Sequence, residues 1–281
     1  MITQVIDTTY QPRFTSSDLS ASITERIKEL AQATDEARMT EEMLQYLETC
    51  AKFHQYSPCN VWCILMACPD ATNVAGYQKW RTFNRYVRKG EQGIPILAPI
   101  FIQENPDDPT SRQELKGFRV VYVFDISQTE GEPLPEPPNW KSPQQNAILS
   151  QRLIDFAKQK SITVTIKRLD GNTQGLSKGG EIELDPSAGT KTLIHEIAHE
   201  ILHQDENRPM DKTIRELEAE SVAYVVGKHF GLDGLSSPNY VALHGATSEM
   251  ILDHLERIRK AASELISQLD NPRISSQINE I

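Results

Sequence analysis

The sequence predicts an α+β fold in which N-terminal helices accompany a small antiparallel sheet and a second, mostly helical part contains a small sheet of its own. Apolar residues recur at helical spacing in several segments, and two β-rich runs in the first half flank a polar, proline-containing connection. The segment 127–146 contains five prolines and has no apolar periodicity. Because proline fixes its own φ and restrains the residue before it, this segment is expected to be a linker between an N-terminal domain, 1–126, and a C-terminal domain, 147–281.

The N-terminal elements follow from apolar spacing and from β-rich composition. Helices are expected at about 19–33, 40–53 and 60–67, because apolar residues there recur three and four positions apart. Strands are expected at 94–102, with the sequence IPILAPIFI, and at 118–126, with the sequence FRVVYVFDI. The connection between these two runs favours antiparallel pairing.

The C-terminal elements combine short strands with longer helices. In chain order they are a helix at 144–160, a strand within 161–169, a glycine-rich turn and strand within 175–185, and helices at 190–203, 213–230 and 247–269. Gly231 stands where the second of these last three helices is expected to end, since glycine accepts the left-handed φ of a helix C-terminus. No motif assigns a role to the last helix.

The composition is typical of a globular chain without a membrane-spanning segment. The chain has 281 residues, enough for one large or two modest domains with their own cores, and 38% of them are hydrophobic. No apolar run approaches the roughly 20 residues that cross a bilayer, and the first residues lack a basic flank before an apolar core. We therefore expect a cytoplasmic protein that does not bind membranes.

The charge and the cysteines argue against two further classes of protein. A formal net charge of −10 argues against a protein that coats nucleic acid with its whole surface, although it leaves room for a local basic patch. The spacing C-x8-C-x3-C-x4-C fits poorly with a zinc knuckle, which needs two close pairs at a distance from each other. We expect reduced thiols buried on helices at Cys50, Cys59, Cys63 and Cys68.

A short motif in the expected helix 190–203 suggests metal chemistry. The sequence HEIAH places His195 and His199 four residues apart, with Glu196 directly after the first histidine. Positions i and i+4 share a helix face, with Cβ atoms about 5 to 6 Å apart, so the two imidazoles are able to bind one ion. Glu196 would stand where a carboxylate holds and deprotonates water. The alternative is an amphipathic helix with incidental histidines, but the apolar residues within and around the motif favour a metal site.

A catalytic zinc ion takes three protein ligands, and the third is expected from the next helix. The sequence RELEAESVAYVVGKHF places Glu216 and Glu220 one turn apart on one face, while Glu218 points about 160° away at roughly 100° per residue. Glu216 is predicted as the third ligand and Glu220 as the acid that orients a ligating imidazole, with an exchange of these roles left open. His203 lies roughly 12 Å along the axis from His195, too far to share an ion, and is assigned a supporting role.

A second segment, 77–89, combines positive charge with aromatic rings. It contains five basic residues and no acid. Basic side chains attract phosphates in a salt-dependent way, and aromatic faces stack on unpaired bases for about 1–3 kcal/mol each. The spacing of Trp80, Phe83 and Val87 also fits the buried stripe of a single helix, so both interpretations stay open on the pattern alone. The candidate nucleic-acid contacts are Tyr77, Lys79, Trp80, Arg81, Arg85, Tyr86, Arg88 and Lys89.

Two parts of the chain resemble the ArdC antirestriction family. HEIAHEILH followed by RELEAESVAYVVGKHFGLD is similar to its zincin-type peptidase domain, with a more distant similarity to ImmA/IrrE-type metallopeptidases. The segment from FHQYSPCNVWC to KGEQGIPILAPI resembles its single-stranded-DNA-binding domain, with GY, a tryptophan, TF and KG in the family order. The resemblance covers residues 20–126 and 145–235, although SPCN at 57–60 stands where the family pattern has a more glycine-like turn.

The resemblance implies a single-stranded-DNA-binding domain tethered to a minimal zincin, which consists of an HExxH helix, a second helix with glutamates and a small sheet. It implies a zinc-dependent metalloendopeptidase that acts in antirestriction or on DNA-associated proteins. Zn²⁺ would be held by His195, His199 and Glu216, with Glu196 as the catalytic base. The sequence does not identify the protein substrate. The alternative is a non-proteolytic protein that shields single-stranded DNA and uses the metal to hold its fold.

Overall fold

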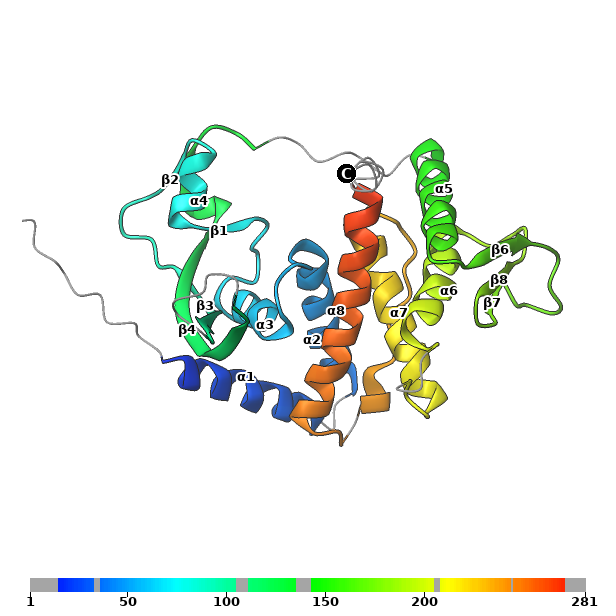
Figure 1. Ribbon diagram of the computed structural model, residues 1–281, viewed down its shortest axis with the longest axis horizontal. Coiled ribbons are helices and arrows are strands. Elements are labelled where there is room, and N and C mark those ends of the chain that lie inside the picture. The colour runs from blue at the N-terminus through cyan, green and yellow to red at the C-terminus, as the bar shows by residue number, and fades with distance from the viewer. Residues whose placement is uncertain are drawn as a thin grey trace, which may run out of the picture.

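The computed structural model of the protein describes residues 15–32, 36–104, 111–134, 143–204, 208–243 and 245–270. Figure 1 shows two groups of helices and strands with the C-terminal helix between them. This mixture of helices and small sheets confirms the predicted α+β class. Within the described ranges, no helix combines the length and the apolar character that crossing a bilayer requires.

Three helices open the described chain: α1 (Ser16–Ala31), α2 (Glu36–Lys52) and α3 (Pro58–Ala67). Ser57 caps α3, and Pro58 occupies the first turn, where the missing N–H of proline would have no helical partner. The side-chain Nδ2 of Asn60 donates to the carbonyl of Leu97 at 2.9 Å, and the side-chain Oδ1 accepts from the Leu97 N–H at 2.8 Å. The SPCN turn is therefore a helix start that is bound to a neighbouring strand.

The following elements are β1 (Val74–Gly76), α4 (Tyr77–Thr82), β2 (Arg85–Val87), β3 (Ile94–Gln103), β4 (Gln113–Asp125), the 3-10 turn η1 (Ile126–Gln128) and β5 (Thr129–Gly131). β4 lies between β1 and β3 in an antiparallel sheet, and β2 forms an antiparallel pair with β5. Ile94 pairs with Val123 and Gln103 with Gln113. The predicted antiparallel pairing of the two β-rich runs is confirmed.

The segment 77–89 does not form the single helix that its apolar spacing allows. α4 ends at Thr82, and Asn84 has a φ of 54°, in the left-handed region where a helix does not continue. β2 then begins at Arg85. Trp80 and Val87 therefore lie on different elements, and the single-helix interpretation is wrong.

The predicted linker begins later than 127. The residues before its first proline are able to donate and accept backbone hydrogen bonds, and three of them form β5 against β2. The side chain of Thr129 strengthens this pair, since its Oγ1 accepts from Arg85 Nε at 2.8 Å. The next described helix begins at Pro143, and residues 135–142 of the predicted linker lie outside the described part.

The C-terminal elements are α5 (Pro143–Gln159), β6 (Thr163–Ile166), β7 (Gly175–Ser177), β8 (Glu181–Leu184), α6 (Thr190–Leu202), α7 (Lys212–His229), the 3-10 turn η2 (Tyr240–Leu243) and α8 (Ser248–Asp270). β8 lies between β6 and β7, parallel to β6 and antiparallel to β7, so β7 is an edge strand of this sheet. Gly231, with a φ of 67°, follows the end of α7, as predicted.

The two halves of the chain share one core. α7 packs against α2, α6 and α8, and Leu47, Val222 and Leu265 belong to one continuous cluster of buried residues. Lys228 of α7 also donates to Glu48 of α2 at 2.6 Å. Figure 1 shows α2, α7 and α8 between the two groups of strands. The division into two domains stays a prediction.

The four cysteines are free thiols, as expected. Cys50 on α2 and Cys63 on α3 are buried, and burial raises the pKa of each thiol to about 12. Cys59 and Cys68 are half-buried, and burial raises their pKa values as well. A raised pKa reduces the thiolate fraction, so these side chains behave as small apolar residues.

Acid is expected to destabilise the protein through His54. This residue is 7% exposed, and its Nδ1 lies 3.1 Å from Ser263 Oγ on α8. Burial, followed by the neighbouring His229, lowers the pKa of His54 from 6.5 to about 4. The unfolded chain therefore binds this proton at a higher pH than the folded chain does. The stabilisation that depends on neutral His54 is therefore fully present above about pH 6.5 and is lost as the pH falls towards 4.

Urea unfolding at pH 7 and pH 4.5 measures this effect. Wild type should lose about 2 kcal/mol of unfolding free energy through His54, at about 1.4 kcal/mol per pH unit. His54→Gln should lose correspondingly less, because glutamine does not titrate. Equal losses in the two proteins would contradict the assignment.

Candidate functional site

α6 has one apolar face towards the core and one histidine-bearing face towards a cleft. Leu193, Ile194 and Ile197 are buried on the core side. The side chains of His195 and His199 are 19% and 15% exposed, and their Nε2 atoms lie 3.1 Å apart. The i and i+4 spacing therefore brings two imidazole nitrogens to one point of the cleft.

Glu216 of α7 brings a third donor atom to this point. Its Oε2 lies 3.5 Å from His195 Nε2 and 3.6 Å from His199 Nε2. Within the described chain, these three side chains form a group whose ligand atoms are close enough to hold one metal ion. A tetrahedral ion with ligand bonds of about 2.0–2.2 Å needs donor atoms roughly 3.4 Å apart, so the three distances fit such an ion.

The charges around this point also favour a cation. Burial alone would lower the pKa of His195, but the neighbouring carboxylates of Glu216 and Glu220 raise it to about 9. Contacts with His195 and His199 hold the pKa of Glu216 far below its usual range. Side chains that bind a proton this strongly provide both the negative potential and the donor atoms that a divalent ion needs.

Glu220 contacts the other nitrogen of His195. Its Oε2 lies 3.2 Å from His195 Nδ1, an ion-pair distance without hydrogen-bond geometry, and its Oε1 lies 2.8 Å from Lys191 Nζ. Burial opposes ionisation of Glu220, but these two neighbours lower its pKa to about 2. The structure thus brings both glutamates to the histidines, and Glu216 is the one within reach of both Nε2 atoms.

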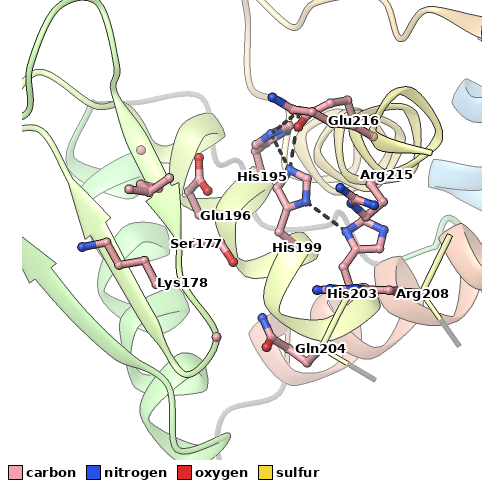
Figure 2. Close-up of a pocket in the computed structure, with 14 residues that line it drawn as sticks. Ser177, Lys178, His195, Glu196, His199, His203, Gln204, Arg208, Arg215 and Glu216 are labelled. Carbon is pink, nitrogen blue, oxygen red and sulfur yellow. Dashed lines mark hydrogen bonds and ion pairs between the residues drawn. The ribbon is translucent and has the colours of Figure 1, made fainter. Parts of the chain in front are cut away.

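Glu196 faces the cleft on the side of β7. It is 7% exposed, and a Cβ on Gly175 would lie 2.5 Å from its Oε1, so a larger residue at 175 would displace the carboxylate of Glu196. Burial raises the pKa of Glu196, while His195 and His199 oppose the shift. A carboxylate with a raised pKa is suited to take up and release a proton. Figure 2 shows Glu196 between His195 and the strand that carries Ser177.

The cleft has a volume of about 540 Å³. β7 and the turn after it line one wall, α6 contributes the histidines and Glu196, and the start of α7 lines the opposite wall. A second hollow of about 490 Å³ shares His195, Glu216 and Lys212 with the cleft and is also lined by Leu217. Substrate groups therefore have room in two adjoining hollows next to the donor atoms.

Glu200 fastens the β7 wall to α6, a role that the motif analysis missed. This residue is 5% exposed and accepts hydrogen bonds from Ser177 Oγ at 2.5 Å and from the N–H groups of Gly179 and Gly180 at 3.0 and 2.7 Å. Both glycines have positive φ, near 85°, which few other residues adopt. The sequence signal for this role is that Glu200 is a second acid, after Glu196, on a helix otherwise rich in apolar residues. A buried carboxylate needs hydrogen-bond donors, so Glu200 is expected to bind a neighbouring segment.

His203 and Glu218 continue the site away from the cleft. His203 Nδ1 lies 2.9 Å from His199 Nδ1, and His203 Nε2 lies 2.9 Å from Glu218 Oε2. Figure 2 shows His199 between His195 and His203. Glu218 is fully buried. Burial opposes its ionisation, but His203 and the cations around it lower its pKa to about 2.

Two of the predicted nucleic-acid contacts are part of the fold and are corrected. Trp80 is 1% exposed, and its Nε1 donates to the carbonyl of Phe124 at 2.8 Å. Arg85 is 9% exposed and donates to Thr129 Oγ1 at 2.8 Å and to the carbonyl of Gly131 at 3.3 Å. The indole and the guanidinium are therefore used to hold α4 and β2 against β4 and β5.

The other predicted residues lie at the surface around α4 and β2. Tyr77 and Tyr86 are 48% and 51% exposed. Phe83, which the stripe interpretation assigned to the core, is 42% exposed and adds a third ring, with Lys79 Nζ 5.3 Å from its centre. The exposed cations are Lys79, Arg81, Arg88 and Lys89, of which Arg88 is paired with Glu91 at 2.7 Å.

The sequence of this chain matches one family model and one curated relative. Residues 16–132 match the family model for the N-terminal domain of the anti-restriction factor ArdC. An uncharacterized protein of Bacillus anthracis is 25% identical in an alignment 297 positions long that spans 86% of this chain and 50% of that protein. The chain therefore spans about half the length of this curated relative.

The fold is similar to that of a protein of known structure. The Mn(II)-bound crystal structure of the antirestriction ArdC protein from plasmid R388 matches with a TM-score of 0.53 and 17% identity, over 90% of this chain and 99% of that chain. The metal-free structure of the same protein has a TM-score of 0.49 and 16% identity, over 77% of this chain and 86% of that chain. Residues 16–132 therefore match an ArdC N-terminal domain, and the fold of the chain is ArdC-like.

Proposed function

We propose that the protein is a metal-dependent peptidase joined to a single-stranded-DNA-binding domain, and that it acts in antirestriction or on DNA-associated proteins. The observation that carries the peptidase half is the convergence of His195, His199 and Glu216 on one point, with Glu196 beside it. The ArdC N-terminal domain supports the DNA-binding half. The resemblance of the two motif helices to a zincin supports the reaction class.

The donor set suits a divalent transition-metal ion. Two imidazoles and one carboxylate are typical ligands of catalytic zinc and also bind other ions of the first transition row. The Mn(II)-bound structure of the R388 protein supports a divalent ion for this family. We propose Zn²⁺ as the ion of this chain because of its donor set.

The residues around the proposed ion have separate roles in peptide hydrolysis. When bound, the ion supplies a Lewis acid for the peptide carbonyl and for water. Glu196 accepts the proton of the attacking water and delivers it to the leaving amine. Glu220 restrains the ring of His195 through Nδ1. One edge of β7 pairs with β8, and its other edge, which no described strand uses, offers backbone groups to an extended peptide.

A double variant, His195→Ala with His199→Ala, is expected to lose the metal ion and the peptidase activity together. Both imidazole donors are removed, and one carboxylate alone binds a divalent ion weakly. Elemental analysis should find stoichiometric metal in wild type and little in the double variant. His229→Gln is the control, because His229 lies outside the site and contacts Asp270 and Ala51. Equal metal content in wild type and the double variant would show that the site does not exist.

Tyr86→Ala is expected to weaken binding of single-stranded DNA by about 1–3 kcal/mol, because a stacking surface is lost. Phe101→Ala is a matched control, since Phe101 is 54% exposed and lies on the distant part of β3. Fluorescence anisotropy with a labelled oligonucleotide measures both affinities. Wild-type affinity should also fall steeply with salt. Equal affinity for duplex DNA, or equal losses in the two variants, would refute this interface.

A further inference from the structure

A buried chain of side chains connects the candidate ligand His199 to α8. His199 Nδ1 lies 2.9 Å from His203 Nδ1, and His203 Nε2 lies 2.9 Å from Glu218 Oε2. The other oxygen of Glu218 lies 2.7 Å from His254 Nδ1 and accepts from Arg257 Nε at 3.0 Å. His203 is 6% exposed and Glu218 is fully buried, so the contact between these two side chains is shielded from water. His203, Glu218 and Arg257 form the relay between His199 and α8.

Arg257 also holds the end of the motif helix. Its Nη2 donates to the carbonyl of Leu202 at 2.7 Å. Leu202 is the last residue of α6, where carbonyl groups have no partner within the helix. One guanidinium on α8 therefore binds both α6 and Glu218 of α7. A buried carboxylate keeps its charge only when it is paired, and Arg257 supplies that pairing.

These contacts determine where the shared hydrogens lie. An ionised Glu218 can only accept, so Nε2 of His203 carries a hydrogen. A neutral His203 ring with its hydrogen on Nε2 presents a lone pair at Nδ1. The hydrogen between the two Nδ1 atoms therefore belongs to His199. His199 Nε2 is left with a lone pair, and this is the atom that lies 3.6 Å from Glu216 Oε2 among the metal donors.

We propose that His203, Glu218 and Arg257 are positioning residues that hold His199 in the Nδ1–H tautomer and so prepare its Nε2 for the metal. This inference rests on the metal site of the proposed function. A metal-bound histidine is usually supported directly by one carboxylate or carbonyl. Here the support passes through a second histidine and ends on α8. The last helix of the described chain is thus part of the metal site.

Two substitutions of His203 separate positioning from packing. His203→Asn keeps an acceptor oxygen near the place of Nδ1 but is too short to reach Glu218. His203→Gln reaches towards Glu218 but leaves His199 Nδ1 without its acceptor. His203→Gln should lower the affinity for Zn²⁺ about 10–100-fold, whereas His203→Asn should keep most of that affinity and lower the thermal stability of the metal-free protein more.

Competition with a chromophoric chelator measures Zn²⁺ affinity in the full chain, and thermal melting measures the stability of the metal-free protein. A larger loss of Zn²⁺ affinity in His203→Gln, together with a larger loss of thermal stability in His203→Asn, supports positioning. If affinity and stability fall in the same order, His203 acts through packing alone and the proposal is overturned.

The tautomer can also be read directly without metal. Proton–nitrogen correlation spectra of the full chain labelled with ¹⁵N-histidine distinguish Nδ1–H from Nε2–H rings. Wild type should show His199 as the Nδ1–H tautomer, and His203→Gln should lose this preference. An Nε2–H tautomer of His199 in wild type would overturn the proposal. The expected tautomer in a protein that does not bind Zn²⁺ would instead support the relay and refute the proposed metal function.

α8 offers a matched pair of arginines for the same test. Arg257→Gln should lower Zn²⁺ affinity about tenfold, because Glu218 and the end of α6 lose a donor. Arg259→Gln removes a guanidinium of the same helix that contacts Glu256 at 2.7 Å and the carbonyl of His54 at 3.2 Å, away from the site. It should leave the affinity unchanged. Equal losses in both variants would exclude a specific role of Arg257.

Discussion

Glu196→Gln is expected to reduce peptide cleavage by about 10²–10⁴-fold, which is the usual contribution of a general base. The amide has the size of the carboxylate but does not accept a proton from water. Glu196 is not one of the three clustered donor groups, so metal content should stay at the wild-type level. The N-terminal surface around Tyr86 is untouched, so DNA affinity should also stay unchanged. Cleavage is measured on candidate proteins bound to single-stranded DNA, with elemental analysis of the same samples.

This variant also separates the peptidase from a protein that only shields DNA. Shielding requires DNA binding but no general base, so antirestriction by shielding would survive in Glu196→Gln. Glu114→Gln on β4 is the control for a substitution of an exposed glutamate, because Glu114 pairs with Ile102 and lies neither on α6 nor on the β2–β5 pair. Full cleavage or full antirestriction activity in Glu196→Gln would remove the peptidase from the proposal and leave the shielding protein.

Glu220→Gln is expected to lower Zn²⁺ affinity by about 10–100-fold. Glu216→Gln should lower Zn²⁺ affinity by more than this. Glu216 Oε2 lies 3.5 and 3.6 Å from the two Nε2 atoms, so an amide in its place removes the anionic donor. Glu220 lies 3.2 Å from Nδ1 of His195 alone, and its loss changes only the orientation and basicity of that ring. Chelator competition gives both dissociation constants.

Glu249→Gln at the start of α8 serves as the reference for this pair, because Glu249 is exposed and is not one of the clustered donor residues. Its affinity should equal that of wild type. A larger loss in Glu220→Gln than in Glu216→Gln would exchange the two roles, an outcome that the sequence left open.

The relative placement of residues within one helix could be predicted from the sequence. His195 and His199 share a face because of their four-residue spacing, and Glu216 and Glu220 share another for the same reason. Which glutamate comes closer to both imidazoles depends on how α6 and α7 cross. That crossing is set by packing along the whole length of both helices, so the sequence favoured Glu216 without excluding Glu220.

Features that depend on partners distant in the chain could not be predicted. The helical spacing after Tyr77 is overridden by Asn84 and by the pairing of Arg85 with Gly131. Trp80 is buried because a carbonyl of β4 receives its indole hydrogen. His203 likewise gains its partner from α7, and the charge of that partner is balanced from α8. Local patterns do not contain these contacts.

Lys228 and Tyr224 have a consequence for work with separate halves of the protein. Both donate to Glu48 of α2, at 2.6 and 3.0 Å, and both stand on the helix that carries Glu216. A fragment that begins after the proline-rich segment would expose the apolar flank of that helix to solvent and leave its carboxylates poorly anchored. Inactivity of such a fragment would then report a damaged scaffold and would say nothing about whether hydrolysis requires nucleic acid.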